Sequence, residues 1–178
     1  MNYNSFKELC EARRSVRYFD NSPVKQEEIL ALLELARTAP SVGNAQPWTF
    51  HVILNKDLRQ KMMDASCYGN FVEGADVFIV VTADITAKPA TGEVLWNPRE
   101  LDYSCIVAMS NIMLGATSMG LGSCLVSLHR GPAHEILNLP RHQVVIGGVM
   151  IGHYKKGEEK PGAGHERKPL KDMYKFYE

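Results

Sequence analysis

Three arginines and one serine fall within five residues near the start of the chain, at Arg13, Arg14, Ser15 and Arg17. Arginine forks form bidentate, charge-assisted hydrogen bonds with phosphate, and a serine hydroxyl can donate a further one. The same residue types also occur in solvated surface turns and at contacts with nucleic acid. Residues 13–17, called the basic segment below, therefore indicate an anion site, and the remaining sequence must distinguish among these alternatives.

The charge balance of the whole chain favours a small ligand. The 178 residues include 20 Lys and Arg and 20 Asp and Glu, so the formal net charge is zero. A neutral protein has no general field that attracts nucleic acid or an anionic membrane. Basic residues cluster locally instead, at 13–17 and at 155–171. We therefore expect a small anionic ligand, and neither nucleic acid nor a membrane as a partner.

A second candidate for ligand contact is the irregular stretch 40–48, which reads Pro-Ser-Val-Gly-Asn-Ala-Gln-Pro-Trp. Two prolines and a glycine interrupt regular structure there. The side chains of Ser41, Asn44 and Gln46 offer hydroxyl and amide groups that can hydrogen-bond a planar polar ligand. A simple connector between two elements would have a similar composition.

The cysteines and histidines form no pattern typical of a metal site. Cys10, Cys67, Cys105 and Cys124 show no CxxC spacing, and the six histidines show no HExxH spacing. We expect no metal, no disulfide framework, and cysteines that act as small core residues. The first residues lack the basic-then-apolar pattern of a signal peptide, so the expected location is the reducing cytoplasm.

The apolar pattern predicts helices and strands that belong to a single domain over 1–178. Helices are expected at 5–13, where Ser5 and Glu8 form a capping box, from 27 to Pro40, and at 55–66, 99–119 and 133–139. Strands are expected at 48–54, 76–82, 123–128 and 144–151. Gly120 and Gly122 suggest a dinucleotide loop only weakly, because they lead from a helix into a strand, the reverse of the required order. Residues 84–99 are expected to form a short loop.

The helix expected at 99–119 is apolar nearly all round, which predicts burial on all sides. Polar residues such as Asp102, Ser110 and Asn111 argue against a membrane span. One subunit of this size can hardly cover such a helix with its own atoms, so we infer a dimer interface. The tail at 155–178 is charged but ends in aromatic residues, and we expect it to dock on the partner subunit.

Several motifs, taken together and in order, resemble the nitroreductase family of FMN-dependent oxidoreductases. They are the basic segment with Tyr18-Phe19, the stretch 40–48, and Gly120-Leu121-Gly122-Ser123-Cys124. The polar-studded helix before the last motif and Arg167-Lys168-Pro169-Leu170 near the end are also similar. The resemblance extends from about residue 5 to residue 174. It implies an α+β fold with a mostly antiparallel central sheet flanked by helices, and an intertwined homodimer with FMN at the subunit interface.

The resemblance also implies which residues bind the cofactor. Arg13 and Ser15 would hold the phosphate and ribityl end, and Arg17 would lie near the flavin N1–C2 edge. The stretch 40–46 would reach the flavin from the other subunit, and backbone groups near Leu125 would approach N5. The full set of expected FMN contacts is Arg13, Arg14, Ser15, Arg17, Pro40, Ser41, Asn44, Gln46, Asn70, Leu125, Val126, Ser127, Arg167 and Lys168.

The activity that the resemblance implies is a ping-pong cycle. NAD(P)H would pass a hydride to flavin N5, and a nitroaromatic, quinone or similar acceptor would then take it. No protein side chain is assigned as a catalytic acid or base, because the flavin carries the chemistry. Two alternatives stay open: a flavoenzyme of the same fold with another reaction (dehalogenation, dehydrogenation or flavin cleavage), or a flavin-binding module without turnover.

Overall fold

The computed structural model describes residues 2–90, 92, 97, 99–154 and 167–177. Its centre is a four-stranded sheet of β1 (Trp48–Ile53), β2 (Val77–Asp84), β3 (Gly122–Val126) and β4 (Gln143–Gly152). The strand order is β1-β2-β4-β3, and each neighbouring pair is antiparallel. The predicted α+β class with a mostly antiparallel sheet is confirmed. β3 and β1 are the two edges of this sheet.

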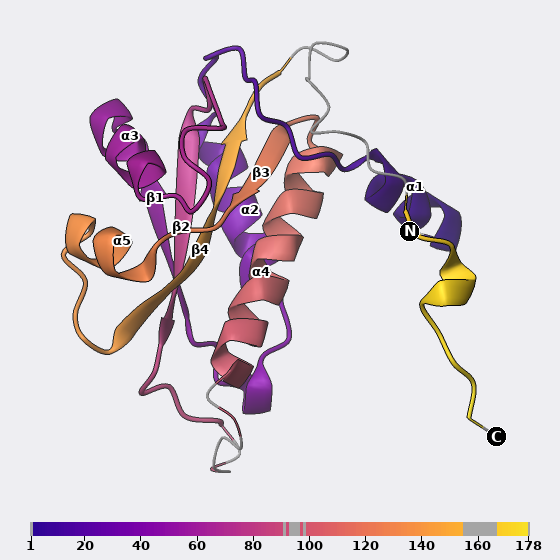
Figure 1. The fold of residues 1–178 in the computed structure, drawn as a ribbon. Helices are drawn as coiled ribbons and strands as arrows, with labels where there is room; N and C mark the ends of the chain where they lie inside the picture. The colour runs from indigo at the N-terminus through magenta and orange to yellow at the C-terminus, as the bar shows by residue number, and fades with distance from the viewer. Residues whose placement is uncertain (1, 91, 93–96, 98, 155–166, 178) are drawn as a thin grey trace.

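Helices cover both faces of the sheet (Figure 1). On one face lie α2 (Gln26–Arg37) and α4 (Arg99–Ser118), and on the other lie α3 (Lys56–Asp64) and α5 (Arg130–Ile136). Side chains of β2 alternate between the two cores, since Ile79 and Val81 pack with the α2–α4 layer whereas Phe78 and Val80 pack with the α3–α5 layer. A strand covered on both faces has a continuous apolar sequence, which is why β2 is easily recognised.

Helix α4 is buried on one side only within the chain. Leu101, Cys105 and Ile112 are buried against the sheet and α2. On the opposite side Tyr103 is 55% exposed and Ile106 54% exposed. The single chain covers only one side of α4, because its own layers reach only one face, as expected for a helix that one subunit cannot cover alone; its coverage by a partner subunit stays a prediction. The uncovered face is an apolar stripe along the longest helix.

The first helix differs from the prediction. α1 spans Tyr3–Ala12, and its N-cap is Asn2, whose side-chain oxygen accepts a hydrogen bond from the backbone N–H of Ser5 at 2.9 Å. The predicted capping box at Ser5 is thus wrong, since an asparagine three residues earlier takes that role. No residue of α1 is buried. α1 and the described end of the chain, which contains η2 (Leu170–Asp172), extend away from the sheet in Figure 1.

Two other expectations need correction. α5 begins at Arg130 and not at 133, because Pro132 falls in the first helical turn, where a missing N–H breaks no hydrogen bond. Cys105 and Cys124 are buried as expected, but Cys10 and Cys67 are exposed, so these two are not core residues. All four cysteines are free thiols.

Candidate functional site

The basic segment is attached to the free edge of β3. Ser15 forms an isolated parallel bridge with Ser123, and the Val16 N–H donates to the Ser123 carbonyl at 2.9 Å. Val16 is 2% exposed and Phe19 8% exposed, so both anchor the segment in the α3–α5 core. Between these anchors Arg17 is half-buried at the surface. Backbone pairing and two apolar anchors therefore hold the charged side chains at a fixed place.

A further segment, residues 65–73, joins the basic segment to the end of β3. The Glu73 N–H donates to the Arg17 carbonyl at 2.8 Å, and the Cys67 N–H donates to the Ser127 carbonyl at 2.9 Å. The Arg17 guanidinium lies 5.9 Å from the centre of the Phe71 ring, a cation–π contact. The structure thus brings the basic segment, the surroundings of Asn70 and the 125–127 stretch to one sheet edge. The sequence pattern does not predict Phe71 as part of the site, and its only signal is its position beside Asn70.

The predicted contacts along 125–127 differ in accessibility. Leu125 is 48% exposed, Ser127 is exposed, and the Val126 side chain is fully buried. Val126 can therefore contact a ligand through its backbone but not through its side chain. Asn70 is exposed, and its amide donates to Asp64 Oδ1 at 3.1 Å while its oxygen accepts from Gln60 Nε2 at 3.1 Å. Gln60 Nε2 also donates to Asp64 Oδ1 at 3.0 Å. The hydrogen bonds from Gln60 and from Asn70 hold the pKa of Asp64 below its ordinary value.

The electrostatics of this edge suit an anion. Burial raises the pKa of the Cys124 thiol, and the positive charges of Arg17 and Arg13 act in the opposite direction. Ion pairs in the described part of the chain join Lys7 to Glu11, Arg37 to Glu34 and Arg130 to Asp102, so neither Arg13 nor Arg17 has a carboxylate partner there. Two guanidinium groups that pair with no carboxylate among the described residues, beside a serine, fit a phosphate.

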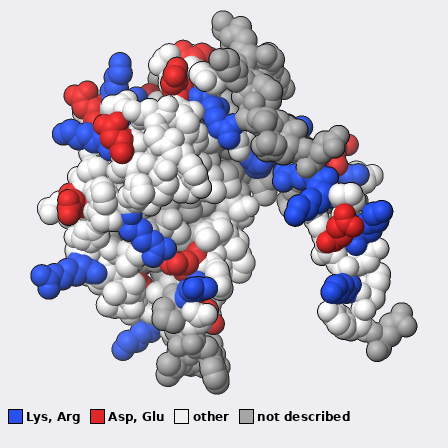
Figure 2. Space-filling view, in the orientation of Figure 1, with Lys and Arg blue, Asp and Glu red and all other residues white. Residues whose placement is uncertain are grey.

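Ser123 adds an unsatisfied hydroxyl to the same edge. Its side-chain oxygen is buried and has no hydrogen-bond partner within the described residues. Leaving a buried hydroxyl unpaired costs about 1–3 kcal/mol, which a ligand or an ordered water can offset. Arg14 behaves differently, since its guanidinium donates to the backbone carbonyls of Glu11 and Arg13 at the end of α1. Figure 2 shows Lys and Arg side chains gathered where α1 joins the body.

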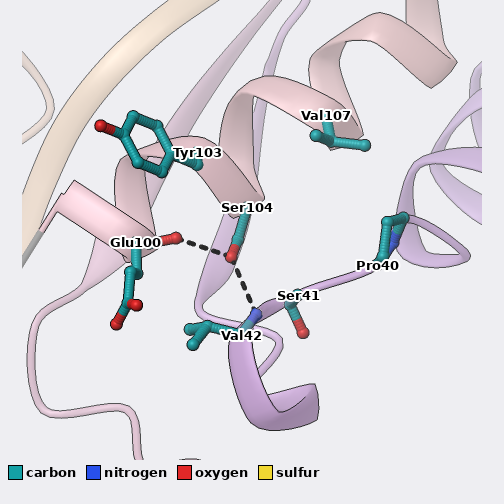
Figure 3. A pocket seen from close by; sticks show the side chains of 7 residues that line it. All are labelled: Pro40, Ser41, Val42, Glu100, Tyr103, Ser104 and Val107. Carbon is teal, nitrogen blue, oxygen red and sulfur yellow. Dashed lines mark hydrogen bonds between the residues drawn. The ribbon is translucent and has the colours of Figure 1, made fainter. Parts of the chain in front are cut away.

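The 40–46 stretch lies at the other end of the molecule, against the start of α4. The Val42 N–H donates to Ser104 Oγ at 3.2 Å, and this hydroxyl donates to the Glu100 carbonyl at 2.8 Å (Figure 3). Asn44 and Gln46 have φ angles of 55° and 46°, the left-handed region that non-glycine residues rarely adopt. The Ala90 N–H donates to the Gly43 carbonyl at 2.7 Å. The loop is therefore shaped by contacts with α4 and with residues just after β2.

A pocket of about 280 Å³ opens between this loop and the first two turns of α4. Two of its lining residues, Pro40 and Ser41, are predicted ligand contacts, whereas those on α4 are not. The apolar pattern of α4 predicts an interface and gives no sign that its polar first turn lines a pocket. The complete lining is Pro40, Ser41, Val42, Glu100, Tyr103, Ser104 and Val107 (Figure 3).

One chain does not bring all the predicted contacts together. The basic segment is next to β3, which follows directly after the end of α4, whereas the 40–46 stretch lies at its beginning (Figure 1). Glu100 and Ser118 are 18 positions apart on α4, or about 27 Å along its axis. Arg167 and Lys168 are exposed, and their contact with a ligand stays a prediction.

Two features that the described residues lack bear on other types of site. None of the helices there is long and apolar enough to cross a membrane. The same residues contain no group of three or more His, Cys, Asp and Glu side chains that could hold a metal ion.

An antiparallel sheet between two helical layers, with a cationic segment paired to its edge, defines an α+β protein whose candidate site lies at that edge. The family model described as "Nitroreductase family" matches residues 10–68 and 64–153. The chain belongs to the nitroreductase family.

Individual proteins agree with this assignment. A protein of Archaeoglobus fulgidus, provisionally named NADH dehydrogenase/NAD(P)H nitroreductase, is 32% identical over 83% of this chain and 84% of its own length. The Bacillus subtilis protein named FMN reductase [NAD(P)H] is 27% identical over 79% of this chain and 62% of its own length. A Desulfovibrio desulfuricans protein, provisionally described as a nitroreductase and solved in complex with FMN, is similar in fold, with a TM-score of 0.80, 24% identity and 99% coverage of both chains.

Proposed function

We propose that this chain is an FMN-dependent NAD(P)H oxidoreductase that reduces planar oxidised acceptors such as nitroaromatics or quinones. Its membership of the nitroreductase family and the names of its relatives support the activity. The observation that carries the proposal is the basic segment, in which Arg13 and Arg17 lie beside Ser15 on the β3 edge and pair with no carboxylate in the described part of the chain.

The residues at this edge fit FMN in a defined order. Arg13 and Ser15 would bind the phosphate, where each charge-assisted hydrogen bond contributes about 1.5–3 kcal/mol. Arg17 is held by Phe71 and would place its charge next to the flavin ring, favouring an electron-rich, anionic form. Backbone groups of 125–127 would contact the ring, and Asn70 would hydrogen-bond its polar edge.

When bound, FMN supplies hydride transfer: it takes a hydride from NAD(P)H and passes it on, so that NAD(P)H, one proton and a quinone become NAD(P)⁺ and a hydroquinone. The protein then has to bind, orient and shield, and it needs no acid–base pair of its own. This requirement suits a site whose charged residues are arginines, which stay protonated at all physiological pH values.

The proposed enzyme works as a homodimer. The uncovered stripe on α4 includes Ile106, which does not line the pocket, and a two-fold axis perpendicular to α4 near its middle would cover the stripe beyond the pocket with that of a second copy. Two α4 helices paired in this way run antiparallel. The start of each helix, with its 40–46 stretch, then meets the end of the other, with its basic segment. A dimer would thus unite the two separated groups of predicted contacts, and the tail at 155–178 would dock across it.

The test is the visible absorbance spectrum of the purified protein after incubation with FMN, repeated after anaerobic addition of NADH or NADPH. We expect an oxidised-flavin spectrum that bleaches with at least one donor and returns when a nitroaromatic or a quinone is added. Flavin that does not bleach would contradict the enzymatic function and favour a binding module. A protein that takes up no FMN would contradict the proposed cofactor.

A further inference from the structure

The pocket at the start of α4 has a chemical character that goes beyond flavin binding. We propose that the first two turns of α4 form one wall of the acceptor site, and that Glu100 makes this wall select planar aromatic acceptors that are neutral or cationic over anionic ones. This inference rests on the proposed function, because an acceptor site requires a flavin opposite it.

The shape of the pocket suits a small flat ring. Its walls are mainly apolar, with Pro40 and Val42 on the loop side and Val107 on the helix side (Figure 3). The Tyr103 ring is 55% exposed, and an aromatic ligand can pack against it face-on or edge-on. The volume of about 280 Å³ is slightly below the range of about 300–1,000 Å³ typical of small-molecule sites. A ligand of one or two rings is the expected occupant.

Few polar groups are left to face such a ligand. The Ser104 hydroxyl is occupied, since it accepts from the Val42 N–H and donates to the Glu100 carbonyl. Ser41 Oγ accepts from the Gln46 N–H at 3.0 Å. The Tyr103 phenol, the Ser41 O–H and the Glu100 carboxylate remain, although Glu100 Oε2 also accepts a long hydrogen bond from the Asn97 N–H at 3.4 Å. Glu100 is the single charged residue among the pocket's lining, and it forms no ion pair with a described residue.

The neighbouring charges do not cancel that of Glu100. Asp102, two positions after Glu100 on α4, is paired with Arg130 at 3.1 Å. The start of α4 contributes a partial positive charge of roughly half a unit, which offsets only part of a full carboxylate charge. Arg99, the exposed residue before Glu100, does not line the pocket, so the charge that the lining itself contributes is negative. This contrasts with the positive basic segment, which would lie opposite in the proposed dimer and bind the cofactor's phosphate.

The experiment compares two acceptors of the same shape and different charge, para-nitrobenzamide and para-nitrobenzoate. Reduced, FMN-loaded protein is mixed anaerobically with each one, and the second-order rate of return of flavin absorbance is measured. This half-reaction excludes NAD(P)H, whose own phosphates would complicate the comparison. For the natural sequence we expect the amide to react faster than the carboxylate, and Glu100→Gln should reduce the amide-to-carboxylate ratio about three- to tenfold.

The matched control is Glu27→Gln, which removes the same charge from the first turn of α2, on an exposed residue outside the pocket. Its ratio should equal that of the natural sequence. If Glu100→Gln fails to fold, the natural protein still gives a test, because added salt should lower the ratio by screening the carboxylate. Turnover with a ratio that neither Glu100→Gln nor salt alters would overturn the inference alone. Protein that binds no FMN, or whose reduced flavin reacts with neither acceptor, would overturn the proposed function and this inference with it.

Discussion

The two candidate regions of this molecule are built in opposite ways. The basic segment is positively charged, and backbone pairing with β3 and the buried anchors Val16 and Phe19 hold it in place. The pocket at the start of α4 is apolar with one carboxylate, and side-chain hydrogen bonds of Ser104 and left-handed loop residues give it its shape. The first region suits a tightly held anion. The second suits a ligand that enters and leaves.

The strongest test of this contrast is Arg13→Ala. Loss of one charge-assisted contact to phosphate should weaken FMN binding by about ten- to a hundredfold, corresponding to about 1.5–3 kcal/mol. Titration of the apoprotein with FMN, followed by flavin fluorescence, measures the change. Arg141→Ala is the matched control, because Arg141 is an exposed arginine in the turn before β4, is assigned no FMN contact, and should alter affinity little. Equal losses in both variants would mean that general charge, and not a specific contact, binds the cofactor.

The loop side of the pocket can be disturbed through Gly43. Its φ angle is +47°, and a Cβ placed there would lie 2.4 Å from Cβ of Pro89. Gly43→Ala should therefore lower the free energy of unfolding by about 1–3 kcal/mol, measured by denaturant titration. Gly131→Ala is the comparison, since an added Cβ meets nothing within 4 Å there. A Gly43→Ala protein as stable as the natural one would show that the loop is free to rearrange.

A smaller effect is expected when Ser104 becomes alanine. The Val42 N–H would lose its hydrogen-bond partner, and the unfolding free energy should drop by about 1 kcal/mol. Thermal unfolding of Ser104→Ala beside Ser118→Ala gives the comparison, since the Ser118 hydroxyl bonds only a carbonyl of its own helix. FMN affinity should remain the same in both variants unless the pocket and the basic segment are coupled more closely than the single chain suggests.

The smallest effect concerns pH and the strand that follows the loop. His51 on β1 hydrogen-bonds Thr82 Oγ1 at 3.1 Å, and burial lowers its pKa from the ordinary value of 6.5. Between the lowered pKa and 6.5 the unfolded chain binds more protons than the folded one. Stability should therefore be complete above about pH 6.5 and decline as the pH falls below it. His51→Gln should remove this part of the slope in denaturant titrations at a series of pH values. An unchanged slope would assign the pH dependence to other groups.

The sequence was sufficient for the parts of the fold that depend on local pattern. β2 and β4 were recognisable because both faces of the sheet are covered, which makes their apolar runs continuous. The basic segment was recognisable because its residue types are informative by themselves. Ser5 and Asn2 are both residue types that suit an N-cap, so the sequence alone cannot choose between them and only the geometry decides.

The parts that escaped prediction depend on contacts between distant residues. The α4 wall of the pocket exists because the 40–46 stretch packs on it through Ser104, 62 positions from Val42. Phe71 meets Arg17 only because residues 65–73 pair with both the basic segment and the end of β3. Neither contact leaves a local signal in the sequence. The exposed face of α4 shows in addition that a correctly predicted helix does not reveal which residues cover each of its faces.

The pairing of Ser15 with Ser123 also affects how the protein behaves in a crowded solution. An open edge strand offers unpaired N–H and C=O groups on which another chain can add a strand, and such edges are frequent starting points of aggregation. Here the outer side of β3 is occupied by the backbone of residues 15–16, and the stretch just after it by residues 66–67. The segment that contains the arginines therefore also covers the edge of the sheet. A substitution that weakened its pairing with β3 would expose the sheet to self-association and would also displace the arginines.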